Sequence, residues 1–344
     1  MERITVAVDA MGGDNAPNAI VAGAIEALRR MPEANVLLFG RKEALEGLIA
    51  DCADVRDRLE IVPCEEVISI EDSPMLAIRK KKDSSLVRAM LAVREKQAQA
   101  VLSAGSTGAV LAGGMFRVGR IQGIDRPALA PVIPGREKPY LLIDAGANVD
   151  CQSAYLEQFG LMGSVYMEKV LHVKDPLVCL ANIGAEEEKG NKLYKEAYQR
   201  MKAQTAYRFG GNIEGRDIPF GRADVVVADG FDGNLILKYT EGLAMALMGM
   251  LKDEIRSSTR AKLGALLMKD TFAGFKKRMN YEDHGGAPLL GVEGVVVKAH
   301  GSSSAKAIAS ALRQTRDMVI GDVPGQIRQG LLGLSGKERE KDNV

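Results

Sequence analysis

Hydroxyl and glycine residues gather in the segment SAGSTGA at 103–109, between a short apolar stretch and an apolar run with helical spacing. Gly105 and Gly108 let the backbone turn sharply and approach a ligand closely. Ser106 and Thr107 lie where a helix would begin, so with the free backbone N–H groups they could hold a phosphate; alternatively, their hydroxyls only cap the helix. The residues of this expected phosphate loop are Ser103, Gly105, Ser106, Thr107 and Gly108.

Acidic residues follow other apolar stretches, in the segments DAMGGD (9–14), DAGAN (144–148) and ADGFDGN (228–234). Such carboxylates could bind a hard divalent cation, but Asp is also well suited to capping helices and forming turns. We favour caps and turns, and we expect no metal site. The residues of these segments that we expect near a ligand are Asp9, Asp14, Asp144, Asn148, Asp229 and Asp232.

Two histidines lie in polar, glycine-rich segments that adjoin strand-like stretches. His284 lies in NYEDHGGAP (280–288), and His300 lies in KAHGSSS (298–304), between an expected strand and an expected helix. Histidine can serve as an acid, a base or a donor to phosphate. A single histidine is more often structural, so both are candidates for direct participation.

The four cysteines lie far apart and form no CxxC pair. Structural zinc and disulfides are therefore not expected. Cys151 and Cys179 lie close to expected strand ends, where either could carry an acyl group in a covalent mechanism. Neither has a sequence neighbour that would lower its pKa, so we expect no catalytic cysteine.

Apolar strands and helical patterns alternate along most of the chain, and they must position these loops. We expect strands at 4–8, 36–39, 59–62, 100–102, 140–143, 177–180, 224–227 and 295–298. We expect helices at 16–30, 84–97, 108–118, 154–173, 188–203 and 304–328. This alternation predicts an α/β fold, with a mainly parallel sheet and helices on both faces. Ligands of such sheets bind beyond the carboxyl ends of the strands, where the loops described above lie.

One segment departs from the alternation, because residues 233–279 predict two successive helices with no strand between them. Within it, residues 259–279 carry apolar side chains at three- and four-residue steps and many basic ones. A basic amphipathic helix suits an anionic membrane surface, and a dimer contact explains the pattern equally well. The residues that we assign to this surface are Lys262, Leu266, Lys269, Phe272 and Phe275.

The chain has 344 residues, with 46 Lys and Arg against 45 Asp and Glu. This balance gives no reason to expect nucleic acid as a partner. The first residues lack the apolar core of a secretory signal, and no stretch of 18 uninterrupted apolar residues appears. We therefore expect a cytoplasmic protein in which residues 1–330 form one two-lobed domain and residues 331–344 form a polar, disordered tail.

The chain resembles the PlsX-type phosphate acyltransferases in segments that follow one another from residue 9 to residue 303. These segments are DAMGGD (9–14), DSPMLAIRKKKDSS (72–85), SAGSTGA (103–109), DAGAN (144–148), ANIGAEEEKGN (181–191), NIEGRD (212–217), ADGFDGN (228–234), NYEDHGGAPLLG (280–291) and KAHGSS (298–303). They cover nearly the whole chain, and several are too long to match by chance.

The resemblance implies an enzyme of bacterial phospholipid synthesis. Such an enzyme transfers a long-chain acyl group reversibly from the thioester of acyl carrier protein to inorganic phosphate. A membrane acyltransferase, a further potential partner, then uses the acyl phosphate to acylate glycerol 3-phosphate. The family also implies a homodimer, no cofactor, and a fold similar to isopropylmalate dehydrogenases and phosphotransacetylases. With the basic helix, it suggests peripheral association with the inner face of the plasma membrane.

Phosphate is a nucleophile at pH 7 and a thioester is an activated carbonyl, so the protein must mainly position both and stabilise an oxyanion. We expect Lys189 or His300 to pair with the phosphate. Asn148, Asn182 and Asn234 are candidate donors to the thioester oxygen, and Asp229 could orient one of them. The nearest alternative is a short-chain phosphotransacetylase that uses coenzyme A; a dehydrogenase and a peripheral membrane scaffold are more distant ones.

Overall fold

The computed structural model describes residues 3–279 and 285–335, which contain two mainly parallel sheets. In the first sheet the strand order is β3-β2-β1-β4-β12-β11-β5. Its strands are β1 (Ile4–Asp9), β2 (Ala34–Gly40), β3 (Leu59–Pro63), β4 (Ala100–Ser103), β5 (Ala128–Leu129), β11 (Ala287–Leu290) and β12 (Val295–Lys298). Only β11 pairs antiparallel with its neighbours, β12 and β5.

Helices cover both faces of the first sheet because its buried strands are apolar on both sides. Along β1, Val6 and Val8 belong to one apolar cluster and Ala7 to another. The first cluster includes residues of α1 (Asn18–Arg30) and α11 (Ala305–Ile320), and the second includes residues of α3 (Pro74–Lys80) and α4 (Ser85–Arg94). The alternation of side chains along one strand thus anchors helices on opposite faces.

The second sheet has the strand order β6-β7-β10-β8-β9, with only β6 antiparallel to its neighbour. Its strands are β6 (Val132–Ile133), β7 (Tyr140–Ile143), β8 (Leu177–Asn182), β9 (Arg208–Glu214) and β10 (Val225–Val227). Helices α6 (Ser153–Lys169) and α7 (Lys192–Ala203) contribute to the core on one face. That core is continuous with the core of the first sheet, so the two sheets share one apolar cluster.

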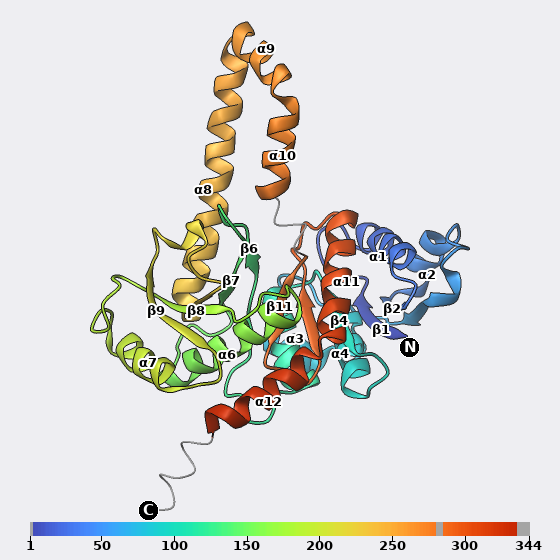
Figure 1. The fold of residues 1–344 in the computed structure, drawn as a ribbon. Helices are drawn as coiled ribbons and strands as arrows, with labels where there is room; N and C mark the ends of the chain where they lie inside the picture. Colours follow the sequence, from blue (N-terminus) through green and yellow to red (C-terminus); the bar gives the residue numbers. More distant parts are fainter. Residues whose placement is uncertain (1–2, 280–284, 336–344) are drawn as a thin grey trace, which may run out of the picture.

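Helix α8 (Gly230–Ser257) leaves the second sheet and projects away from both sheets, and α9 (Thr259–Leu267) and α10 (Lys269–Met279) return beside it (Figure 1). The expected insertion is confirmed, but it contains three helices and not two. The Ser258 backbone is extended, and its side chain caps α9 by accepting a hydrogen bond from the Ala261 N–H at 3.0 Å. A second break at Met268 separates α9 from α10, so residues 259–279 do not form the single amphipathic helix that we expected.

The C-terminal helix expected at 304–328 is also divided, into α11 and α12 (Val323–Ser335). Residues 331–335 belong to α12, so the described chain is still helical where we expected the polar tail to start; residues 336–344 lie outside the described part. The remaining short helices are α2 (Lys42–Glu46), α5 (Thr107–Gly113), η1 (Gly47–Ile49), η2 (Arg56–Arg58), η3 (Gly114–Val118) and η4 (Ile218–Phe220). None of the helices in the described residues has both the length and the apolar character needed to cross a lipid bilayer.

Candidate active site

Three polar residues form a row at the carboxyl end of the first sheet. Ser103 of β4 pairs in register with Asp9 of β1 on one side and with Lys298 of β12 on the other. All three are buried, with at most 7% of each residue exposed. Because these strands are parallel neighbours, their ends bring a carboxyl, a hydroxyl and an amine to one edge of the sheet.

The Asp9 carboxyl organises the loops around this row. It accepts hydrogen bonds from the Ser85 hydroxyl at 2.6 Å and the Ser103 hydroxyl at 2.7 Å, and the Gly105 N–H donates in turn to the Ser103 oxygen at 3.0 Å. Burial raises the pKa of Asp9, while the hydrogen bonds from Ser85 and Ser103 oppose the shift. A side chain at Gly12 would lie 2.4 Å from the carboxyl, so only glycine allows this approach. Asp9 therefore helps to hold the 103–109 loop in place through Ser103.

The 103–109 loop, where we expected phosphate, leads into α5, whose first residue is Thr107. Ser106 occupies the N-cap position, but its side chain makes no capping hydrogen bond. Capping therefore does not explain the hydroxyl of Ser106. The alternative that these hydroxyls serve a ligand gains support, because Thr107 lies on the wall of a cavity together with Lys298 and His300.

Lys298 is the lysine that lies on the same side of the cavity as Thr107 and His300, where we expect phosphate. Its amine donates to the carbonyl oxygens of Ala104, at 3.4 Å, and of Ala299. Burial lowers its pKa from 10.5 to about 8, although the carboxylates of Asp9 and Asp14 act in the opposite direction. A buried amine that is still protonated near neutral pH can bind an anion strongly.

His300 lies next to Lys298 on the loop that follows β12 and is exposed to the cavity. Its Nδ1 accepts a hydrogen bond from the Ser302 N–H at 3.2 Å, so in the neutral ring the proton resides on Nε2. Nε2 is then a donor for a ligand oxygen. Asp14 holds the same loop, since its N–H donates to the Gly301 oxygen at 2.8 Å. The other candidate, His284, lies outside the described residues.

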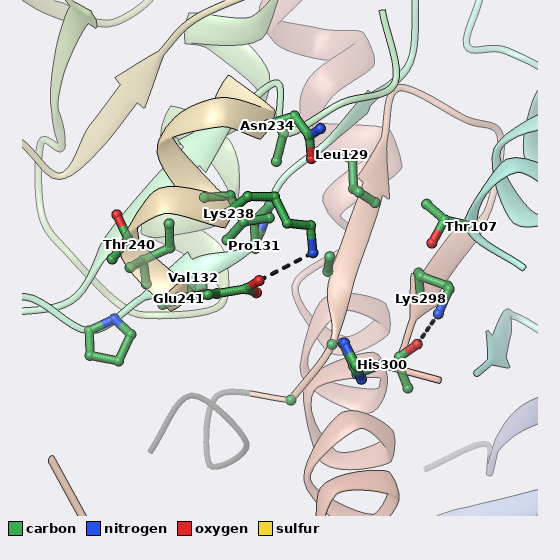
Figure 2. A pocket seen from close by; sticks show the side chains of 18 of the residues that line it. Thr107, Leu129, Pro131, Val132, Asn234, Lys238, Thr240, Glu241, Lys298 and His300 are labelled. Atoms are coloured by element: carbon green, nitrogen blue, oxygen red, sulfur yellow. Dashed lines mark hydrogen bonds and ion pairs between the residues drawn. The ribbon is translucent and has the colours of Figure 1, made fainter. Parts of the chain in front are cut away.

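The cavity has a volume of about 250 Å³ and lies between the two sheets. Figure 2 shows Thr107, Lys298 and His300 on one side of it, and Asn234, Lys238 and Glu241 of α8 on the other. Lys238 and Glu241 form an ion pair at 3.2 Å. The wall between these two sides is apolar and consists of Leu129, Pro131, Val132, Ile133, Pro134 and Ala145.

The loop after β7 supports this wall, and its polar atoms are already used. The buried Asp144 carboxyl accepts hydrogen bonds from the Leu129 N–H at 2.9 Å and from the Asn148 backbone and side chain at 2.7 and 3.0 Å. Burial raises the pKa of Asp144. The Asn148 amide also donates to the Pro127 oxygen at 2.8 Å. Its N–H groups therefore have protein partners, which argues against Asn148 as the donor to a substrate oxygen.

Asp229 and Asp232 stabilise the start of α8. Asp229 is the N-cap and accepts from the Asp232 N–H at 2.8 Å, and the Tyr194 hydroxyl donates to the Asp232 carboxyl at 2.8 Å. Burial raises the pKa of Asp229. A side chain at Gly233 would lie 1.9 Å from the Asp144 carbonyl oxygen, so this glycine lets α8 start against the 144–148 loop. Asn234 follows at once and reaches the cavity.

Asn182 and Lys189 do not line the cavity. Asn182 is the last residue of β8 and Lys189 lies in the loop that follows; the Asn182 amide donates to the Lys189 carbonyl oxygen at 3.2 Å and to the Asn212 side chain at 3.1 Å. The structure thus offers no support for Lys189 as the partner of phosphate or for Asn182 as a donor to the thioester.

The expected site residues thus divide into two groups. Thr107, Asn234 and His300 line the cavity, whereas the Ser103 hydroxyl donates to Asp9 and accepts from the Gly105 N–H. Within residues 3–279 and 285–335, no group of three or more His, Cys, Asp or Glu side chains is arranged to hold a metal ion. Sequence reasoning missed Lys298 as a site residue. Its position could have identified it, because Lys298 ends a strand of three valines and directly precedes the loop that contains His300.

We predict that replacing Cys151 and Cys179 with alanine lowers the rate of acyl phosphate formation less than about tenfold, or 1.4 kcal/mol. Burial raises the pKa of Cys151 to about 12 and that of Cys179 to about 11, so neither is a thiolate at pH 7. Neither lines the cavity. Steady-state rates of the double variant check this prediction, and isolation of an acyl-cysteine intermediate would refute it.

A family model described as "Fatty acid synthesis protein" matches residues 4–326. The chain is 49% identical to a phosphate acyltransferase of Alkaliphilus oremlandii, over 97% of this chain and 99% of the relative. It is 51% identical to a phosphate acyltransferase of Clostridium botulinum, over 90% of this chain and 92% of the relative.

The fold is also similar to solved structures with little sequence identity. A phosphotransacetylase from Streptococcus pyogenes matches with a TM-score of 0.62 and 16% identity, over 92% of this chain and 94% of the other. The EutD phosphotransacetylase from Staphylococcus aureus matches with a TM-score of 0.59 and 12% identity, over the same shares of the two chains. The expected likeness to phosphotransacetylase folds is confirmed.

Proposed function

The chain belongs to the phosphate acyltransferases of the fatty acid synthesis protein family, and from this premise we propose that its acyl donor is a long-chain thioester of acyl carrier protein. Inorganic phosphate is the acceptor, and the acyl phosphate product serves the acylation of glycerol 3-phosphate. The observation that carries this proposal is one cavity with a cationic, hydroxyl-bearing side and apolar walls. The cationic side of such a cavity suits a phosphate, and the apolar walls suit an acyl chain, so the two reactants could bind next to each other.

In the proposed reaction a phosphate oxygen forms a bond to the thioester carbon. The carbonyl oxygen becomes an oxyanion, and on its collapse the carbon–sulfur bond breaks and its electron pair leaves with the thiolate. Thr107 and the N–H groups at the start of α5 would hold the phosphate, together with Lys298. His300 Nε2–H or the Asn234 amide, which faces it across the cavity, would donate to the oxyanion.

Product analysis with competing donors tests the proposed function. The protein would be incubated with phosphate and either hexadecanoyl acyl carrier protein or acetyl coenzyme A, and acyl phosphate would be trapped as its hydroxamate. We expect the long-chain thioester to react with the higher kcat/KM. A preference for acetyl coenzyme A would instead favour the short-chain phosphotransacetylase, to which the likeness is one of fold. Addition of NAD without formation of NADH would argue against a dehydrogenase.

We further propose that the outer end of the α8–α10 hairpin docks on the anionic inner face of the plasma membrane. Leu263, Leu266 and Leu267 of α9 are 61%, 67% and 83% exposed. Lys262 and Lys269 lie within the same few residues and could meet lipid headgroups. Phe272 and Phe275 are less exposed than these leucines, and Phe275 faces α8, so α9 carries the proposed contact.

We predict that Leu266→Glu with Leu267→Glu abolishes sedimentation with anionic liposomes, because two charges would enter the apolar layer. Binding of the unaltered protein should weaken with salt, as screening of surface charge requires. Leu332→Glu of α12, which alters a leucine that is 75% exposed, is the control and should leave binding intact. If the double variant instead converts a dimer to monomers, α9 forms part of the proposed homodimer contact.

A further inference from the structure

A second cavity extends from the candidate active site along α8. Its volume is about 780 Å³, and it shares Pro134, Thr240 and Ala244 with the first cavity. The two cavities therefore adjoin at these residues; Lys298 also lines the first, and Leu247 of α8 and Phe275 of α10 line the second. We call the two adjoining cavities the path.

Helix α8 provides one side of the whole path. Leu237, Thr240, Ala244 and Leu247 recur at three- and four-residue steps, which places them on one stripe of a helix. From Asn234 at the reactive end to Leu247 at the far end, the helix rises about 20 Å. That length is comparable with an extended long-chain acyl group.

The chemistry of the path changes along its length. Polar side chains of Thr107, Lys298 and His300 mark the reactive end. In the second cavity Arg136 is the one charged residue among the described lining residues, and its guanidinium lies 5.6 Å from the centre of the Phe220 ring. The other residues of this part are mostly apolar, and include Tyr140, Ile218, Ile236, Leu243, Leu247 and Phe275.

We propose that this path binds the acyl chain of the substrate, with the thioester beside Lys298 and the methyl end between α8 and α10. The inference rests on the proposed function and adds to it a binding site for the chain. It also gives a role to apolar side chains that are otherwise unpartnered, since Leu243 and Leu247 are 43% and 49% exposed. An acyl chain bound in the path would cover them, and each buried methylene would add to the affinity for the acyl donor.

We expect Ala244→Phe to lower the ratio of kcat/KM for hexadecanoyl over butyryl acyl carrier protein at least about tenfold. Ala244 lies where the two cavities join, so a phenyl ring there would close the path to long chains. The matched control is Ala246→Phe. That residue lies two positions along the same helix, is exposed and lines neither cavity, so the ratio should not change.

A second variant, Leu247→Glu, places a charge at the far end of the path. We expect it to lower kcat/KM for the hexadecanoyl donor and to spare an octanoyl donor, whose chain would end before Leu247. If each variant lowers kcat/KM equally for all chain lengths, or if neither variant changes it, the path does not bind the acyl chain. The proposed function would survive either result, because acyl phosphate would still form. Absence of acyl phosphate from every donor with the unaltered protein would instead overturn the proposed function and the role of the path with it.

Discussion

Replacing Lys298 with methionine is expected to lower kcat/KM for acyl phosphate formation about 100-fold or more. The buried amine donates to the carbonyl oxygens of Ala104 and Ala299 at the edge of the cavity, and methionine keeps an unbranched side chain that is one atom shorter while removing the charge. A charge in such a site interacts strongly with phosphate because little water screens it. Steady-state kinetics at several phosphate concentrations would measure the loss.

The matched control is Lys189→Met. Lys189 is the lysine that sequence reasoning proposed for phosphate, but it does not line the cavity, so kcat/KM should change less than about threefold. If Lys189→Met shows the large loss and Lys298→Met does not, the assignment made from the cavity is wrong.

The pKa of Lys298 adds a pH dependence to this expectation. Burial lowers that pKa from 10.5 to about 8, so the protein should lose the activity that depends on the ammonium as pH rises through about 8. The same shift makes the ammonium unfavourable for folding below pH 8, and this cost disappears between pH 8 and 10.5. Lys298→Met should therefore not lower the thermal midpoint at pH 7, and a large decrease would indicate a structural role.

Thr107→Val is expected to raise the KM for phosphate about 10- to 100-fold, which is the effect of losing one hydrogen bond to a charged group. Valine preserves the shape of threonine and removes only the hydroxyl, so the fold should remain intact. Because the hydroxyl binds phosphate both before and during the reaction, kcat at saturating phosphate should change much less than KM.

Thr240→Val provides the comparison for this experiment, because Thr240 lies on the same cavity but on α8. It should leave the KM for phosphate unchanged. An unaltered KM in a well-folded Thr107→Val protein would remove the 103–109 loop from the phosphate site. Circular dichroism and thermal unfolding would establish that both variants are folded.

The eight strands expected from the sequence are confirmed, and their apolar runs explain why. The division into two sheets could not be predicted, because it depends on strands that are short or irregular. Strands β5 and β6 have two residues each, and β9 contains Gly210 and Gly211 beside a break in its pairing with β8. Such segments carry little periodicity, and tertiary pairing decides their structure.

Candidate site residues could be chosen from the sequence because ligands of parallel sheets bind beyond the carboxyl ends of the strands. This rule led to Ser103, Thr107 and His300 because β4 and β12 are neighbours in the first sheet. It also led to Asn182, which is the last residue of β8 in the second sheet and does not line the cavity. The sequence indicates which residues lie at the carboxyl ends of strands, but it does not indicate which strands are neighbours in one sheet. Lys298 was missed because a lysine at a strand end is more often exposed, and only the packing of three strands buries it.

The two sides of the cavity belong to different sheets, and the chain crosses between them at Ala130 and Pro131, next to the apolar wall. The Ala130 N–H donates to the Pro288 oxygen of the first sheet at 2.9 Å, and the Pro131 oxygen accepts from the Leu142 N–H of the second at 3.1 Å. The crossing is thus bonded to both sheets, and the two sheets also share one apolar cluster. The fold itself therefore sets the width of the cavity, because a close-packed core resists changes in the separation of the elements that it joins.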